Sequence, residues 1–310
     1  MSDRNRRFVL LANPAAGSTD DEITEQVTDR LNRLGQVEVR SLETSQDTET
    51  SATATLSGPT AAPDSFGATG SETASDEIAS PDPALDAAIT EADGRCLVVL
   101  GGDGSLHRTV ARMAALDRFD LDVALVPLGT GNDLARGAGL ALDPMAAVDA
   151  LAEYSARPMD ILVGNGSVVV NAVHLGLGAD AAVQASRWKA RLGPAAYPLG
   201  AVVAGTWSSP WELKVTVDGR VIHNGTTVLA GIGNGRTVGG GTTMFPGARL
   251  DDGQVVVVVA GSQWGRVGRA VFGRSLRQGV HGRLPWVRVV RGRHVEVTGE
   301  PVTGNADGEI

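Results

Sequence analysis

The sequence is poor in the residues that build covalent or metal frameworks. Cys96 is the only cysteine among 310 residues, so the chain can form no internal disulfide and no multi-cysteine metal site. The five histidines are scattered without a pair at helical ligand spacing, which argues against a zinc site. Cys96 itself lies in an apolar run that ends at Leu100, and we expect it to be a buried strand residue.

Positive charge and long apolar runs are scarce as well. The formal net charge is −9, and Lys189 and Lys214 are the only lysines, which argues against a nucleic-acid partner because such proteins normally carry a basic face. No apolar run approaches the ~18 residues that span a bilayer. The apolar stretch after the basic N-terminus is too short for a signal peptide. We therefore expect a cytoplasmic protein with at most peripheral contact at the inner membrane face.

The first half of the chain alternates apolar strands, glycine-containing turns and helices. The pattern predicts strands over 8–12, 36–42, 96–100 and 123–126, and helices over 19–34, 85–92 and 106–115. This order is typical of an α/β fold, with a Rossmann-like parallel sheet whose ligand loops lie at the carboxyl ends of the strands. We assign residues 1–156 to this nucleotide-binding domain. Within it, the small and polar residues from about Glu43 to Pro83 predict a disordered insertion.

The second half is dominated by short β-type runs separated by glycine-rich turns. The predicted strands cover 160–163, 168–173, 212–217, 226–232, 255–260, 287–290 and 294–297, with one helical interruption over 181–206. We expect residues 157–310 to form a C-terminal β-sandwich or a distorted barrel. An exposed edge strand in this domain could support a homodimer.

Three glycine-containing turns follow predicted strands of the first domain: Asn13–Gly17, Gly101–Ser105 and Gly129–Asn132. Glycine lets backbone N–H groups approach a phosphate without interference from a Cβ. One such turn is more often a plain strand–helix connection, whereas three at neighbouring strand ends favour a phosphate site. The loops also carry Asp103 and Asp133, and an acid beside a polyphosphate implies a bridging divalent cation, Mg²⁺.

Two of these loops resemble a known family. Gly101-Gly-Asp-Gly-Ser105 is similar to the GGDGT loop of diacylglycerol kinases, sphingosine kinases, bacterial lipid kinases and NAD kinases, and Pro127-Leu-Gly-Thr-Gly-Asn-Asp-Leu-Ala-Arg136 resembles the diacylglycerol-kinase-type catalytic domain specifically. Further similar segments follow in the family's order, at 13–17, 191–197, 239–241, 250–253 and 307–309. The resemblance implies an ATP-dependent lipid kinase that phosphorylates the hydroxyl of a lipid alcohol such as diacylglycerol.

The resemblance also implies roles for individual residues. Asp103 would help to hold the catalytic Mg²⁺, and Asp307 with Glu309 would supply the general base for the substrate hydroxyl. A structural Mg²⁺ would bind the Asp252 side chain and the backbone oxygens of Arg249 and Gln254, although an ordinary Asp-Gly turn explains this loop equally well. The residues expected around ATP are Asn13, Pro14, Gly17, Thr44, Gly101, Gly102, Asp103, Gly104, Ser105, Leu106, His107, Gly129, Thr130, Asn132 and Asp133.

The chain departs from the family pattern at four places. His107-Arg108 stand where many relatives have Asn-Glu, and Ser105 replaces the usual threonine. Ser18 stands where some bacterial relatives have lysine, so Mg²⁺, Arg108, Lys189 or Arg191 would neutralise phosphate charge. Family members usually continue past the position of Ile310 with one or two strands, and we expect the Asp307 loop to be less firmly held without them.

Other functions stay open at this point. NAD kinase shares the GGDGT-like loop, and a non-catalytic nucleotide- or lipid-binding relative would share most of the motifs. The lipid acceptor would lie on the apolar face of the β-rich half. The apolar stretch 195–204, with Trp207 and Trp211 after it, is either a membrane or lipid-channel element or part of the core.

Overall fold

The computed structural model describes residues 6–12, 21–42, 81–164, 166–176, 210–262, 265–302 and 304–307. The chain forms two compact units, and the change from one to the other falls between Val170 and Asn171, later than the predicted boundary after Ala156. Several predictions lie outside the described residues: those for Asn13, Pro14, Gly17, Thr44 and Glu309, nearly all of the insertion, the helix at 181–206, and the stretch 195–204 with Trp207.

The first unit is built on a four-stranded parallel sheet in the order β2-β1-β3-β4, which confirms the predicted α/β fold. Its strands are β1 (Arg6–Ala12), β2 (Gly35–Ser41), β3 (Cys96–Gly101) and β4 (Val123–Pro127). β1 and β3 lie in the middle and are almost wholly buried, which explains their unbroken apolar sequences. Cys96 is buried as expected.

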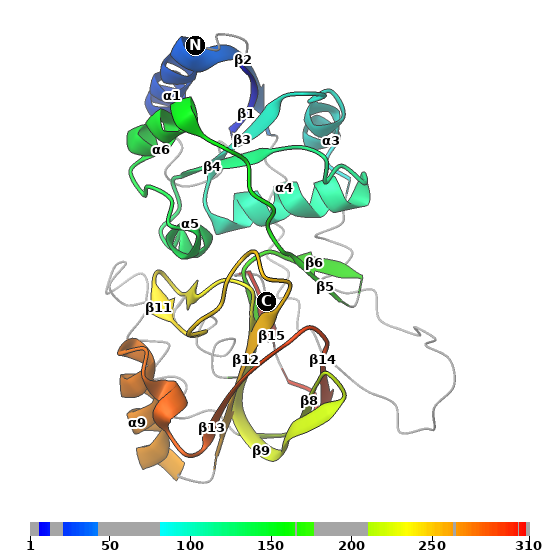
Figure 1. The fold of residues 1–310 in the computed structure, drawn as a ribbon, viewed down its shortest axis with the longest axis vertical. Coiled ribbons are helices and arrows are strands. Elements are labelled where there is room, and N and C mark those ends of the chain that lie inside the picture. The colour runs from blue at the N-terminus through cyan, green and yellow to red at the C-terminus, as the bar shows by residue number, and fades with distance from the viewer. Residues whose placement is uncertain are drawn as a thin grey trace. The chain divides into compact units, whose positions relative to one another are not determined.

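Helices cover both faces of this sheet (Figure 1). α1 (Asp21–Leu34) and α6 (Pro144–Ala150) pack on one face, where Val27, Leu31 and Val148 join the core of β1, β3 and β4. α3 (Pro83–Thr90) and α4 (Asp103–Ala115) pack together on the other. The unit is completed by α5 (Asp133–Ala138), the short helix η1 (Leu151–Glu153) and a hairpin of β5 (Leu162–Gly164) and β6 (Ser167–Val169).

The second unit is a seven-stranded antiparallel sheet. β13 (Val287–Gly292), β12 (Val255–Gly261), β9 (Arg220–Gly233), β7 (Ala172–Gly176) and β15 (Gly304–Ala306) are neighbours in that order, and β8 (Trp211–Val217) pairs with β9 and with β14 (Val295–Gly299). β10 (Thr237–Val238) and β11 (Thr242–Thr243) form a separate small ribbon. The prediction of a homodimer through an edge strand stays a prediction.

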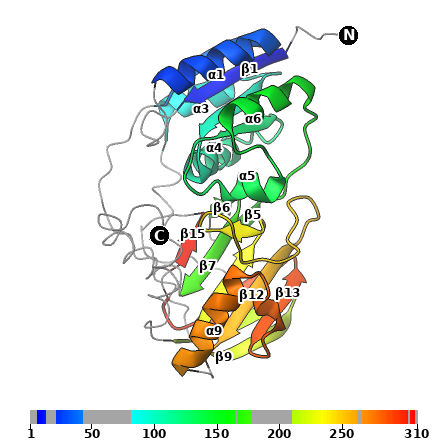
Figure 2. The ribbon, with the colours of Figure 1, turned by 90° about the vertical axis from the view of Figure 1, so that its left-hand side faces the viewer.

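Both faces of this sheet carry apolar cores. Along β12, Val256 and Val258 pack into one core, and Val257 and Val259 pack into the other, because side chains of a strand alternate between faces. The helix α9 (Gly265–Arg277) lies against the sheet and covers the first core (Figure 2). The short helix η3 (His281–Arg283) follows α9 along the chain. Trp211 is half-buried and packs against the second core.

The structure differs from the predicted elements at three places. The run predicted as one strand over 168–173 is divided between β6 and β7, α4 begins at Asp103 rather than at Leu106, and α9 had not been predicted at all. Within the described ranges, no helix has the length and apolar character needed to cross a membrane.

Candidate active site

The two glycine loops of the first unit touch each other at the carboxyl edge of the parallel sheet. A Cβ added to Gly102 would lie 2.9 Å from the Cα of Gly129, and one added to Gly129 would lie 2.7 Å from the Cα of Gly102. The Leu128 N–H also donates to the Gly101 carbonyl at 2.9 Å. Only glycine fits at this contact, so the loop after β3 and the loop after β4 form one backbone surface.

Asp103 ties the same two loops together. Its Oδ2 accepts the N–H of Asp133 at 3.0 Å and its Oδ1 accepts the N–H of Leu134 at 3.1 Å, which are the first backbone donors of α5. The sequence had suggested that Gly101–Ser105 is a turn, but Asp103 to Ser105 form the first turn of α4, with Gly102 as its N-cap. An acidic side chain is favoured at that helix position because it complements the helix dipole.

Asn132 shapes the second loop. Its backbone is left-handed, with φ of 49°, a conformation that asparagine tolerates better than most residues. Its side-chain Nδ2 donates to the Gly129 carbonyl at 2.7 Å, while its buried Oδ1 has no hydrogen-bond partner in the described part of the chain. A cradle without Cβ atoms and an unused buried acceptor fit a polar ligand such as a nucleotide.

Not all residues predicted around the nucleotide lie on this surface. Gly104 and Thr130 are exposed, whereas Leu106 and His107 are each 4% exposed on the inner side of α4. Arg108, a candidate for neutralising phosphate charge, forms an ion pair of 2.5 Å with Asp82, the N-cap of α3. Arg108 therefore joins α4 to α3 in this structure.

The second unit holds Asp307 firmly. Its Oδ1 accepts the N–H groups of Asn171 at 2.8 Å and Ala172 at 2.9 Å, and its own N–H donates to the Ala172 carbonyl at 3.0 Å. Asp307 directly follows β15, which pairs with β7, and its φ is 52°. The expectation of a loosely held loop was wrong for this residue, because two hydrogen bonds from Asn171 and Ala172 fix its carboxylate and a third fixes its backbone N–H.

Asn171 is a candidate positioning residue that the sequence analysis missed. Its carbonyl accepts the N–H groups of Asn234 and Gly235, both at 2.9 Å, and its Nδ2 donates to the Thr237 carbonyl at 3.0 Å. A Cβ on Gly235 would lie 1.9 Å from the Asn171 Oδ1, so this packing requires glycine. Asn171 thus joins the loop after β9 to Asp307, and its sequence signal was a single amide within an apolar run.

In the loop predicted to hold a structural Mg²⁺, both carboxylate oxygens of Asp252 contact other protein groups. The Asp252 Oδ1 accepts the Gln254 N–H at 3.1 Å, its Oδ2 forms an ion pair with Arg291, and Arg249 pairs with the neighbouring Asp251. Among the described residues no group of three or more His, Cys, Asp or Glu side chains could hold a metal. A divalent cation and the Arg291 guanidinium would compete for the same carboxylate, and the metal role of Arg249, Asp252 and Gln254 stays a prediction.

Comparisons with known proteins agree with these motifs. Residues 7–163 match the family described as "Diacylglycerol kinase catalytic domain", and residues 171–310 match "YegS C-terminal NAD kinase beta sandwich-like domain". The chain belongs to the diacylglycerol kinase-type lipid kinase family. The "Probable lipid kinase YegS-like" proteins of Pseudomonas aeruginosa strain PAO1 and Pseudomonas fluorescens strain Pf-5 are 37% and 34% identical to this lipid kinase over 229 and 224 residues. Each alignment covers 67% of this chain, and it covers 70% and 72% of the two relatives, respectively.

Solved structures share the fold of this lipid kinase. A diacylglycerol kinase from Bacillus anthracis strain Sterne aligns over 99% of this chain and 90% of its own, with a TM-score of 0.64 and 16% identity. A second crystal structure from the same organism reaches a TM-score of 0.73 at 19% identity, with the same coverage. At these identities the likeness concerns the fold alone.

The lipid-kinase motifs fall into separate groups. The structure brings Gly101–Ser105 and Gly129–Asp133 together in the first unit, and it joins Asp307 to Asn171 in the second. Arg249, Asp252 and Gln254 form a loop of the second unit. The roles given to Asn13, Pro14, Gly17, Thr44 and Glu309 stay predictions.

Proposed function

We propose that this lipid kinase transfers the γ-phosphate of ATP to the hydroxyl group of a lipid alcohol, diacylglycerol or a related glycerolipid. The observation that carries the proposal is the contact between Gly102 and Gly129, which leaves a backbone surface free of side chains at the carboxyl edge of the parallel sheet. Ligands of open α/β sheets bind at that edge, and glycine loops there suit phosphate groups.

The nucleotide half of the site would use the first turn of α4 and the loop before α5. The first turn of a helix presents backbone N–H groups that bind phosphate oxygens. Asp103 and Asp133 are the carboxylates that would hold Mg²⁺, because each carboxylate oxygen can accept more than one bond. When bound, Mg²⁺ neutralises charge on the phosphates.

The acceptor half would use Asp307 as the general base. The lipid hydroxyl oxygen forms a bond to the γ-phosphorus, the bond from that phosphorus to the β–γ bridging oxygen breaks, and ADP leaves. The hydroxyl proton passes to the Asp307 carboxylate. The two N–H bonds to Asp307 Oδ1 support this role, because a fixed carboxylate keeps its orientation toward a bound alcohol.

The test is a transfer assay with γ-labelled ATP and Mg²⁺. Wild type and Asp307→Asn receive lipid alcohols in mixed micelles (diacylglycerol, a dialkylglycerol ether, a polyprenol, a sphingoid base) or, in a separate reaction, NAD. We expect label in one lipid class with wild type and a large loss with the variant. Label in NADP would show that the acceptor is NAD and not a lipid alcohol. ATP binding without transfer would identify a non-catalytic relative.

A further inference from the structure

One segment of the chain has a charge opposite to that of the rest. Between Asp252 and Glu296 the sequence contains eight arginines and no acidic residue. The remaining 19 basic and 36 acidic residues give the rest of the chain a net charge of −17. The segment includes β12, α9, η3 and β13 of the second unit. An acidic protein thus concentrates positive charge on one stretch, a pattern typical of a surface that meets an anionic partner.

α9 has one face in the core and one face in solvent. Phe272 is buried and Leu276 is partly buried in the core that α9 shares with β9 and β12, and both follow Gly268 at intervals of four residues. At about 100° per residue, the opposite side of the helix carries a second set of residues. These residues, here called the α9 outer face, are Val267, Ala270, Val271, Arg274 and Arg277, and all five are exposed.

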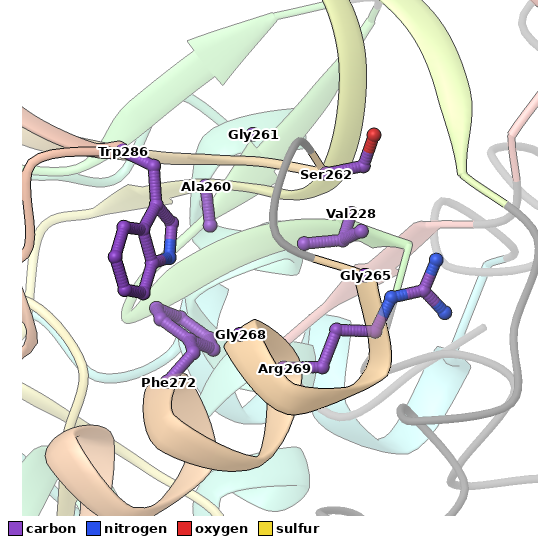
Figure 3. Close-up of a pocket in the computed structure, with 9 residues that line it drawn as sticks. All are labelled: Val228, Ala260, Gly261, Ser262, Gly265, Gly268, Arg269, Phe272 and Trp286. Atoms are coloured by element: carbon purple, nitrogen blue, oxygen red, sulfur yellow. The ribbon is translucent and has the colours of Figure 1, made fainter.

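The inner side of α9 does not offer room for a lipid. The hollow between α9 and the sheet has a volume of about 10 Å³, roughly the space of one water molecule, whereas ligand pockets begin at ~300 Å³. Phe272 and Trp286 line one side of it and Arg269 the other (Figure 3). A lipid partner of α9 would therefore meet its outer face.

The α9 outer face combines arginines that form no ion pair with a described carboxylate and valines that are exposed to solvent. Val267 is 77% exposed and Val271 is 40% exposed. Arg274 and Arg277 form no ion pair with any described carboxylate, and neither does Arg283 in η3, which contacts α9. Arginines in the last turn complement the helix dipole, but that role does not account for the two exposed valines on the same side.

We infer that the α9 outer face, together with Arg283, docks on the surface of an anionic lipid bilayer. Arginines attract anionic head groups, and the valines enter the boundary between head groups and acyl chains, which is how amphipathic helices bind a membrane plane. Valines would gain little from a nucleic-acid backbone, which is bound through charge and hydrogen bonds. The inference rests on the proposed function in one respect: a lipid alcohol acceptor resides in such a bilayer.

The test is sedimentation of the full chain with sucrose-loaded vesicles of phosphatidylcholine, with or without about 30 mol% phosphatidylglycerol, at about 0.1 M salt. Wild type should pellet with the anionic vesicles only. Arg274→Ala/Arg277→Ala should lower partitioning about 25-fold, at about fivefold for each arginine. The matched control is Arg157→Ala/Arg220→Ala, which removes the same charge from exposed positions outside α9 and should bind like wild type. Val267→Ser/Val271→Ser should weaken binding about fivefold.

Three results would overturn the inference. They are a wild type that does not pellet, a control that loses as much binding as the α9 arginine variant, and serine variants that bind like wild type. Tighter binding to a DNA duplex than to vesicles would assign the surface to a different partner. A kinase assay separates this inference from the proposed function. The α9 variants should lose activity on vesicle-embedded diacylglycerol but keep it on a short-chain diacylglycerol dissolved as monomers. If wild type phosphorylates no lipid alcohol, the proposed function fails, while the pelleting result still decides the docking surface.

Discussion

Gly129→Ala perturbs the contact on which the candidate nucleotide site is built. The new Cβ would lie 2.7 Å from the Gly102 Cα and 2.8 Å from the Asn132 Oδ1. Carbon atoms pack at about 3.5 Å or more, so the two loops must separate by roughly 0.8 Å. The Gly129 backbone is not left-handed, and the cost is therefore steric rather than conformational.

The separation acts on the bonds that join the loops. Asp103 accepts the N–H groups of Asp133 and Leu134 at 3.0 and 3.1 Å, and a shift of about 0.8 Å takes both beyond hydrogen-bond range. Overpacking costs about 1–3 kcal/mol, and weakening two charge-assisted bonds adds to it. We expect the free energy of unfolding to fall by about 2–4 kcal/mol and the rate of phosphate transfer to fall about 100-fold, because the loops no longer align the phosphates.

The assays are urea unfolding followed by circular dichroism, and the rate of phosphate transfer from γ-labelled ATP. Gly164→Ala is the control, since its Cβ would meet no atom within 4 Å. A Gly129→Ala protein that matches the control in both stability and transfer rate would refute the glycine contact as the basis of the site.

Three further perturbations test other parts of the structure. Burial raises the pKa of Cys96 to about 12, so iodoacetamide at about pH 8 should label it only after unfolding; rapid labelling of native protein would contradict this burial. Burial lowers the pKa of His281, so the stability gained from its neutral form is present above about pH 6.5 and is lost as the pH falls further. His281→Gln, whose amide can still donate to the Met244 carbonyl, should make the acid loss of thermal stability shallower, and an unchanged slope would count against the assignment. Arg291→Ala frees the Asp252 carboxylate, so millimolar Mg²⁺ should raise the Tm of this variant and leave that of wild type unchanged; an equal rise in both would show that the arginine does not displace the cation.

The parallel half of the fold was predictable because β1, β3 and β4 are short apolar runs followed by glycine or proline, and β2 alternates in polarity. The β3 and β4 loops were recognised as a ligand site for the same reason, since glycine at a strand end is a local signal. The start of α4 was misplaced because Asp103-Gly104-Ser105 also reads as a turn. The deciding interaction is the contact of Asp103 with Leu134, which is 31 residues away.

The second half was harder because its signals conflict or are not local. α9 contains Gly265, Gly268 and Gly273 and has no acidic residue in its first turn, so its sequence lacks the usual marks of a helix. Its place in the fold comes from packing of Phe272 on the sheet. β15 is three residues long and exists through its pairing with β7, which no local pattern encodes.

In the proposed reaction, Asp307 accepts the proton of a lipid hydroxyl during phosphate transfer. The most direct test compares kcat and ATP affinity for Asp307→Asn and Asp117→Asn. Both aspartates have a φ of 52°, so asparagine places the same side chain on the same backbone in the two variants. We predict a loss of kcat of about 10²–10⁴-fold for Asp307→Asn alone, with ATP affinity unchanged in both. Equal kcat values for the two variants would contradict the account.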